Sequence, residues 1–277
     1  MLVRTLSKLE DEGRIASIAG GTFTAIRRLT RPDGLDFSLS EAQTRAGGQF
    51  DLWYKHHWEA NYLRSGAATL ENRTTGETWS LKPGTLYCVG PHDKHRLTYS
   101  EGTDLRIVSV FNPPIVGTET HDADGSYPAS GKTPQGRESM FVRTAEDVPT
   151  VGTKLAVGDD LASVQSYLTL ADGLGFSLHS VHVKEGVESD VWYKNHWEAN
   201  LLLEGDCQVT NLANGDVHRL GAGDLYLVGP DDRHHVQART DVHILSVFDP
   251  PLAGDEPRDG DGSFPATGPI PAGPPRD

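Results

Sequence analysis

Two copies of a short motif place histidine and glutamate where they could bind a metal ion or substrate. The nonapeptide WYKHHWEAN, beginning at residue 53, returns as WYKNHWEAN beginning at residue 192. In a β-strand, residues two apart face the same side. The spacing therefore predicts that His57 and Glu59 point together, as do His196 and Glu198.

A tyrosine and a histidine follow in each copy. Tyr87 and His95 lie eight residues apart with Pro91 midway between them. A hairpin centred on this proline would make them cross-strand neighbours on one face, and the same holds for Tyr226 and His234. Each copy is thus expected to present Glu, Tyr and His to one small cavity. Such oxygen and nitrogen donors suit Fe(II), Zn(II) or Mn(II) better than a thiolate site would. The alternative is a set of barrel-lining polar residues held by hydrogen bonds.

The repeat extends well beyond these motifs. MLVRT at residues 1–5 returns as MFVRT at 140–144. A period this long indicates a duplicated domain, because the units of solenoid proteins are about 20–50 residues long. We predict an N-terminal domain at 1–128, a linker at 129–139, a C-terminal domain at 140–265 and a Pro/Gly-rich tail at 266–277, either disordered or lying on the surface.

Turn-forming residues punctuate the chain every 8–12 residues, and β-rich stretches such as 85–89 and 105–111 lie between them. This pattern is typical of an all-β sandwich or barrel. Helical periodicity is weak, with short candidates near 6–12 and 144–148. The fold class predicted is therefore all-β, with one small barrel in each copy.

Composition and charge argue against some classes of partner and site. The formal net charge of −14 argues against nucleic acid or an anionic membrane as partner. Cys88 and Cys207 fall at non-equivalent positions, so a disulfide or thiolate site shared by both copies is not expected. There is no 18-residue apolar run and no signal-peptide pattern at the N-terminus. We expect a cytoplasmic protein.

The repeated motifs resemble those of one family. WYKxHWEAN, then Gly-x-x-Tyr with a downstream Asp and His, then VFNPP and HDxDGSYP resemble ectoine synthase, a single-domain member of the cupin superfamily. The chain resembles two such enzymes in tandem, a bicupin. The family performs an iron-dependent cyclisation in which the α-amino group of N-γ-acetyl-2,4-diaminobutyrate attacks its own acetamide carbonyl and water is lost. The resemblance thus implies a metal-dependent cyclodehydratase, a carbon-oxygen lyase, whose copies pair as the subunits of a cupin dimer do.

The resemblance also assigns roles to residues in both copies. The implied metal ligands are Glu59, Tyr87, His95, Glu198, Tyr226 and His234, with Fe(II) as the expected metal. The implied catalytic residues are Tyr54, His57, Glu119, His121, Tyr193 and His196. The implied substrate-binding residues are Arg27, Ala42, Phe111, Pro113, Val181, His182, Phe248 and Pro250.

The substrate-binding positions also carry the departures from the family. A family threonine is replaced by Ala42 and Val181. His179 and His182 of the second copy replace a serine and a glutamine of the first, and Arg27-Arg28 corresponds in the sequence to Gln165-Ser166. Two alternatives therefore stay open: an iron-dependent oxidation or other elimination on a different substrate, and a non-catalytic barrel that binds a small solute.

The copies also differ at a residue with acid–base potential. His121 of the first copy corresponds to Arg258 of the second. A histidine can exchange a proton near pH 7, whereas an arginine stays charged. We therefore expect the first copy to carry most of the turnover.

Overall fold

The computed structural model describes residues 1–148, 150–152 and 161–275. Two compact units divide the chain: Leu9–Asp147 forms one, and Met1–Lys8 with Val148–Asp277 forms the other. Both are built almost entirely of β-strands, which confirms the predicted all-β class.

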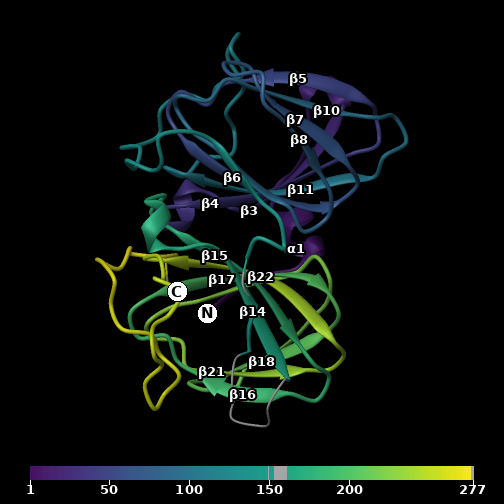
Figure 1. Cartoon of the computed structure of the whole chain (residues 1–277). Coiled ribbons are helices and arrows are strands. Elements are labelled where there is room, and N and C mark those ends of the chain that lie inside the picture. Colours follow the sequence, from purple (N-terminus) through teal and green to yellow (C-terminus); the bar gives the residue numbers. More distant parts are fainter. Residues whose placement is uncertain (149, 153–160, 276–277) are drawn as a thin grey trace. The chain divides into compact units, whose positions relative to one another are not determined.

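The N-terminal unit is a sandwich of two antiparallel sheets, visible in Figure 1 as the layer of β5, β10, β7 and β8 facing that of β6, β11, β4 and β3. The larger sheet has the order β12 (Phe141–Arg143), β9 (Leu86–Val89), β6 (Trp58–Ser65), β11 (Leu105–Asn112), β4 (Ser38–Thr44), β3 (Phe23–Leu29) and β2 (Ile15–Ile18). The smaller has the order β5 (Gly48–Leu52), β10 (His95–Tyr99), β7 (Ala68–Asn72) and β8 (Thr78–Leu81). Side chains of both inner faces meet in one apolar core.

The C-terminal unit repeats this plan. Its larger sheet has the order β1 (Leu2–Arg4), β20 (Leu225–Val228), β17 (Trp197–Glu204), β22 (Val242–Asp249), β15 (Ser177–Val183), β14 (Ala162–Leu168) and β13 (Thr150–Gly152). Its smaller sheet has the order β16 (Glu188–Val191), β21 (His234–Ala238), β18 (Cys207–Asn211) and β19 (Val217–Leu220).

Helices are few and short. The predicted helix near residue 6 is α1 (Leu6–Asp11), and single 3-10 turns lie at Ala19–Gly21, Arg31–Asp33 and Leu170–Asp172. The second predicted helix is wrong. Residues 144–148 form a turn, because the Asp147 carboxylate accepts the backbone N–H of Thr144 at 2.7 Å and closes the chain locally. Within the described part of the chain, no helix has the length and apolar character needed to cross a membrane.

The first strand of each repeat pairs with the other repeat. In β1, Val3 lies opposite Tyr226 of β20; in β12, Val142 lies opposite Tyr87 of β9. The compact units therefore differ from the domain boundaries expected from the repeat, since each unit takes its edge strand from the other copy's sequence.

The segment expected to be a linker and the tail expected to be disordered or to lie on the surface each cover a tryptophan. The Nε1–H of Trp58 donates to the carbonyl of Pro134 at 3.2 Å, and a Cβ added to Gly136 would lie 2.1 Å from the same ring. The C-terminal copy repeats the arrangement, with Trp197 donating to the Pro271 carbonyl at 3.0 Å. The "linker" and the described part of the tail are thus packed straps.

Candidate functional site

The tyrosine and histidine of each candidate metal set lie on different sheets, which the sequence did not indicate. Tyr87 and His95 lie on β9 and β10, which belong to different sheets, so the predicted hairpin about Pro91 is wrong. The chain crosses from one layer of the sandwich to the other at this point. In the C-terminal copy the rings of Tyr226 and His234 are centred 6.3 Å apart across the interior.

Glu59 shares the inner face of the larger sheet with Tyr87. Asn61 lies opposite Tyr87, and Glu59 is two residues earlier in the same strand, so the two side chains point inward together. Burial raises the pKa of Glu59 to about 7. Burial also raises the pKa of Tyr87 well above its ordinary value, and the nearby Glu59 charge raises it further. Glu198 and Tyr226 show the same two effects.

His95 presents one ring nitrogen to this interior. Its Nδ1 lies 3.1 Å from the carbonyl of Asp93, to which it donates, while the buried Nε2 has no hydrogen-bond partner among the described residues. Burial lowers the pKa of His95 to about 4, so the ring is neutral near pH 7. A neutral imidazole oriented through Nδ1, with an unsatisfied Nε2, is how metal-binding histidines are commonly held. His234 has the same Nδ1 contact, to Asp232, at 2.9 Å.

The donor chemistry fits a divalent metal. In the part of the chain that the structure describes, no group of three His, Cys, Asp and Glu side chains is placed to hold a metal ion. The candidate set differs from such a group because one of its three donors is a phenol. A buried carboxyl, a phenol and an imidazole with an unsatisfied nitrogen are ligand types that Fe(II), Zn(II) and Mn(II) accept.

Both ring nitrogens of His57 and of His196 contact backbone carbonyls. His57 is fully buried, and its Nδ1 and Nε2 lie 2.9 and 3.1 Å from the carbonyls of Pro113 and Pro128. His196 makes the same contacts, with Pro250 and Pro265. His57 lies just before β6 and connects the segment at Pro128 to the end of β11, so these contacts support a structural role, and the catalytic role stays a prediction.

His121 forms a pair with Tyr54. The hydroxyl of Tyr54 lies 3.2 Å from Nε2 of His121, and the imidazole stacks on Tyr127 at a centroid distance of 4.3 Å. Desolvation lowers the pKa of His121, which keeps the ring neutral near pH 7. The carboxylate of Glu119 accepts the backbone N–H groups of Val116 and, at 2.6 Å, of Gly117, so it holds the loop after β11.

Arg258 replaces this histidine in the C-terminal copy. Its guanidinium lies 4.6 Å from the ring centre of Phe264 and 5.8 Å from that of Tyr193. Its charge lowers the pKa of Glu198, against the larger effect of burial. Although Arg258 is exposed, it therefore lies close to the candidate metal ligands.

The expected substrate-binding residues divide into three groups. Phe111 packs edge-on against Tyr54 at 5.3 Å, and Phe248 packs in the same way against Tyr193. Pro113 and Pro250 contribute the carbonyls that hold the buried histidines. The remaining four are Arg27, Ala42, Val181 and His182.

Arg27 and Ala42 lie on β3 and β4, and Val181 lines the C-terminal cavity. The Arg27 charge acts against the rise in the pKa of Tyr127, which burial brings to about 12. His182 is placed differently from the prediction. It is exposed and stacks on His243 at 4.0 Å, because it alternates with Val181 and faces away from the interior.

The strand register corrects one sequence correspondence. Arg27 pairs with Ser40, and Ser166 pairs with His179, so the counterpart of Arg27 is Ser166 and not Gln165. His179, noted in the sequence as a departure from the first copy but given no role, lines the cavity. Its nitrogens contact the hydroxyls of Ser166 at 3.0 Å and Ser177 at 2.9 Å.

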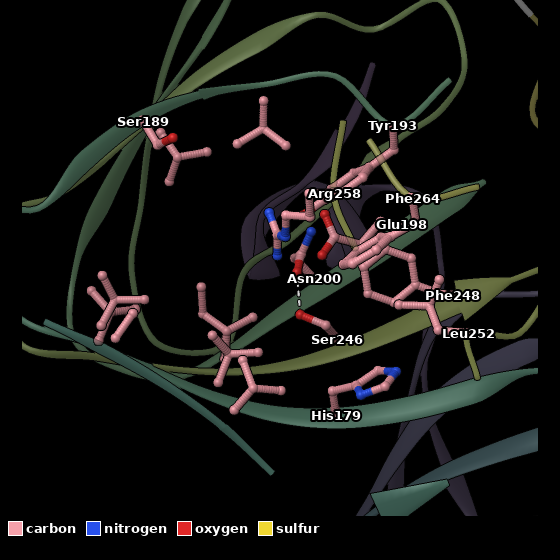
Figure 2. A pocket seen from close by; sticks show the side chains of 18 of the residues that line it. His179, Ser189, Tyr193, Glu198, Asn200, Ser246, Phe248, Leu252, Arg258 and Phe264 are labelled. Carbon is pink, nitrogen blue, oxygen red and sulfur yellow. Dashed lines mark hydrogen bonds between the residues drawn. The ribbon is translucent and has the colours of Figure 1, made fainter. Parts of the chain in front are cut away.

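The C-terminal copy encloses a cavity of about 480 Å³. Figure 2 shows Tyr193, Glu198 and Phe264 gathered toward one end, Arg258 nearer the middle and Ser189 at the other end. His179 and Ser246 project from the larger sheet between them. The cavity is of the size that small-molecule sites usually have.

Solved structures share this architecture. The oxalate decarboxylase from Lactobacillus farciminis, in its formate complex, aligns with a TM-score of 0.65 over 91% of this chain and 87% of that one, at 14% identity. A single-residue mutant of Bacillus subtilis oxalate decarboxylase also gives 0.65, over 92% of this chain and 78% of its own, at 14% identity. At such identities the likeness shows the fold alone, which is that of a tandem cupin.

Sequence comparison identifies the family. The family model described as ectoine synthase matches residues 1–131 and again 140–268. The L-ectoine synthase of Oceanobacillus iheyensis is 42% identical over 128 residues, which are 46% of this chain and 97% of that protein. That of Desulfatibacillum aliphaticivorans is 43% identical over 130 residues, 46% of this chain and 97% of its own length. The chain belongs to the ectoine synthase family, as two copies in tandem, and is an ectoine synthase-like lyase.

Proposed function

We propose that this protein closes a ring in N-γ-acetyl-2,4-diaminobutyrate or a close relative, with loss of water, using Fe(II) held by Glu59, Tyr87 and His95. Family membership supports the reaction class. The observation that carries the site is the unsatisfied Nε2 of His95 in an interior that also receives a buried carboxyl and a phenol. A divalent metal at this set would polarise the amide carbonyl of the substrate.

The reaction needs a neutral amine. The α-amino nitrogen forms a bond with the amide carbon, and the bond from that carbon to the carbonyl oxygen breaks. Both protons of the amino group leave on that oxygen as water. In this proposal His121 takes a proton from an incoming ammonium group or passes one toward the departing oxygen, and its neutral state near pH 7 and its hydrogen bond with Tyr54 support that role.

The surroundings favour dehydration over hydrolysis. Tyr54 and Phe111 are buried and pack against each other, and Tyr127 completes the apolar wall. Such a wall excludes bulk water from the ring-closing step. The reciprocal exchange of β1 and β12 supports the further proposal that the two copies act as an intramolecular pair in place of a dimer of separate chains.

The test is to load the protein with Fe(II), add N-γ-acetyl-2,4-diaminobutyrate and follow ectoine by liquid chromatography. Ectoine should form, and the metal-free protein and Glu59→Gln should form little. If the loaded protein forms no ectoine but transforms another acylated diamino acid, the reaction type stands and the substrate assignment is wrong. If it transforms no acylated diamino acid, the proposal is wrong.

A further inference from the structure

One end of the N-terminal barrel is filled by three aromatic rings. Phe23 of β3, Phe50 of β5 and Tyr99 of β10 pack together, with ring centres 5.3, 5.9 and 6.1 Å apart. They belong to both sheets and so close the sandwich at this end. A side chain at Gly48 would collide with two of them, which shows how tightly the rings fill the space.

The C-terminal barrel has no ring at any of the three equivalent positions. The strand register gives the equivalence: Phe50 lies opposite Leu97, as Ser189 lies opposite Val236. By the same register Phe23 corresponds to Ala162 and Tyr99 to Ala238.

The loss of the rings leaves an apolar space that continues into the candidate site. Ala162, Ser189 and Ala238 line the same 480 Å³ cavity as Glu198, Tyr226 and His234. Aliphatic side chains line this end beside Ala162, Ser189 and Ala238, among them Val183, Val187, Val236 and Val242. Val187 is the counterpart of Gly48. Its side chain fills only part of the space that the three rings occupy in the first copy. In Figure 2 the end near Ser189 lies opposite the end near Phe264 and Tyr193.

The cavity therefore has three chemically distinct parts. Arg258 supplies a positive charge beside Tyr193 and Phe264. Glu198, Tyr226 and His234 supply polar ligand atoms, and the valine-lined end supplies an apolar surface. A chain that fills an apolar cavity gains affinity roughly in proportion to the area that it buries, whereas an empty cavity costs stability.

We propose that the C-terminal copy binds an acylated diamino acid whose acyl chain is longer than acetyl. The carboxylate lies at Arg258, the amide at the Glu198, Tyr226 and His234 set, and the unbranched aliphatic chain in the valine-lined end. The identity of the head group rests on the function proposed above, while the preference for an aliphatic chain rests on the missing rings. Arg258 and the apolar end are thus specificity determinants of the second copy.

The experiment measures binding of the N-γ-acetyl, butyryl, hexanoyl and octanoyl derivatives of 2,4-diaminobutyrate to the Fe(II)-loaded full chain by calorimetry. Affinity should rise about fourfold for each methylene added until the cavity is full. Ala238→Phe, and the triple variant Ala162→Phe, Ser189→Phe, Ala238→Tyr, should remove this gain and leave binding of the acetyl compound unchanged. Arg258→Met should weaken binding of all the longer chains by a similar factor, about tenfold.

The matched control gives the first copy the small residues that the second copy has at the three positions. Phe23→Ala, Phe50→Ser, Tyr99→Ala should create a second site that prefers long chains. Thermal melting checks that each variant is folded. If the triple variant is not folded, the single variant Ala238→Phe replaces it in the binding measurements. Affinity that does not depend on chain length, or chain-length dependence that survives both refilled variants, would overturn the inference. Ectoine formation from the acetyl compound is scored separately. Its failure alone rejects the acetyl compound as substrate and leaves the chain-length result standing.

Discussion

At the scale of single residues, hydrogen-bond partners separate the roles of two buried histidines. His57 has a carbonyl at each ring nitrogen, so both nitrogens are engaged in holding loops. His95 has a carbonyl at Nδ1 and, among the described residues, no partner at Nε2. Sequence spacing shows that both copies contain His57 and His95 equivalents. It cannot distinguish a histidine that holds two backbone segments together from one that binds a metal ion.

The two histidines should respond differently to substitution. His95→Ala should lower the metal content of the iron-loaded protein by about one ion per chain, with little loss of stability beyond that of the metal itself. His57→Leu should keep the metal but lower the free energy of unfolding by about 2 kcal/mol, because it leaves the buried carbonyl of Pro113 without its donor. Elemental analysis and urea unfolding measure the two effects. Equal metal loss in both variants would contradict these assignments.

The buried carboxyls should make the metal-free protein less stable as pH rises. Burial raises the pKa of Glu59 and of Glu198 to about 7 from an ordinary value of 4.5. Between these values the folded carboxyl keeps a proton that the unfolded one has lost, so the free energy of unfolding falls as pH rises from about 4.5 to 7. The loss is at most about 3 kcal/mol for each carboxyl.

Urea unfolding of the chelated protein at pH 5 and pH 7.5 measures this loss. Comparison with the double variant Glu59→Gln, Glu198→Gln isolates the carboxyls, because burial lowers the pKa of His95 and so gives a pH dependence of the opposite sign. The double variant should lose less stability between the two pH values than the natural protein. A pH dependence that is the same in both proteins would show that the carboxyls are ionised in the folded state.

At the scale of elements, the sequence predicted the strands well and their connections less well. Turn-forming residues and β-rich composition located β9 and β11, predicted at 85–89 and 105–111, because both signals are local in the sequence. The crossing from β9 to β10 was predicted as a hairpin. Nothing local distinguishes a turn within one sheet from a turn between two sheets, since the choice depends on which partner strand is available.

Exchange of the first strands gives a prediction that differs between the copies. Truncation of residues 1–5 removes β1, so amide hydrogen exchange should accelerate in β20 and remain unchanged in β9. Replacement of residues 141–143 by Gly-Ser-Gly removes β12 and should give the reverse result. Mass spectrometry of peptides from the two strands is the measurement. If truncation at the N-terminus accelerated exchange in β9 instead, each repeat would keep its own first strand.

The strap over Trp58 depends on one glycine. Gly136 has φ of +59°, and a Cβ there would lie 2.1 Å from the tryptophan ring. Gly136→Ala should therefore lower the free energy of unfolding by more than the 1–2 kcal/mol or so that a left-handed backbone costs an alanine. Gly76→Ala is the control, because Gly76 has φ of +77° and no atom near its added Cβ. Equal losses in both variants would show that the strap can lift from the ring without cost.

At the scale of the whole molecule, duplication both revealed the candidate site and concealed the difference between the copies. Matching residues at a fixed offset marked Glu59, Tyr87 and His95 without any alignment. The absence of the three rings from the second copy could not be interpreted from the sequence alone. Replacement of an aromatic residue by Ala or Ser becomes informative only when the structure shows that Phe23, Phe50 and Tyr99 pack together. The sequence thus predicted the shared chemistry of the copies and missed the difference in cavity shape.

This difference predicts that the two copies convert the acetylated substrate at different rates. His121 can exchange a proton near pH 7 and contacts Tyr54, whereas Arg258 stays charged and the cavity beside it is too large for an acetyl group to fill. Glu59→Ala should therefore reduce ectoine formation at least 100-fold, while Glu198→Ala should reduce it less than twofold. Steady-state rates of both variants, each corrected for its measured metal content, give the comparison. A larger loss from Glu198→Ala would assign the turnover of the acetylated substrate to the C-terminal copy.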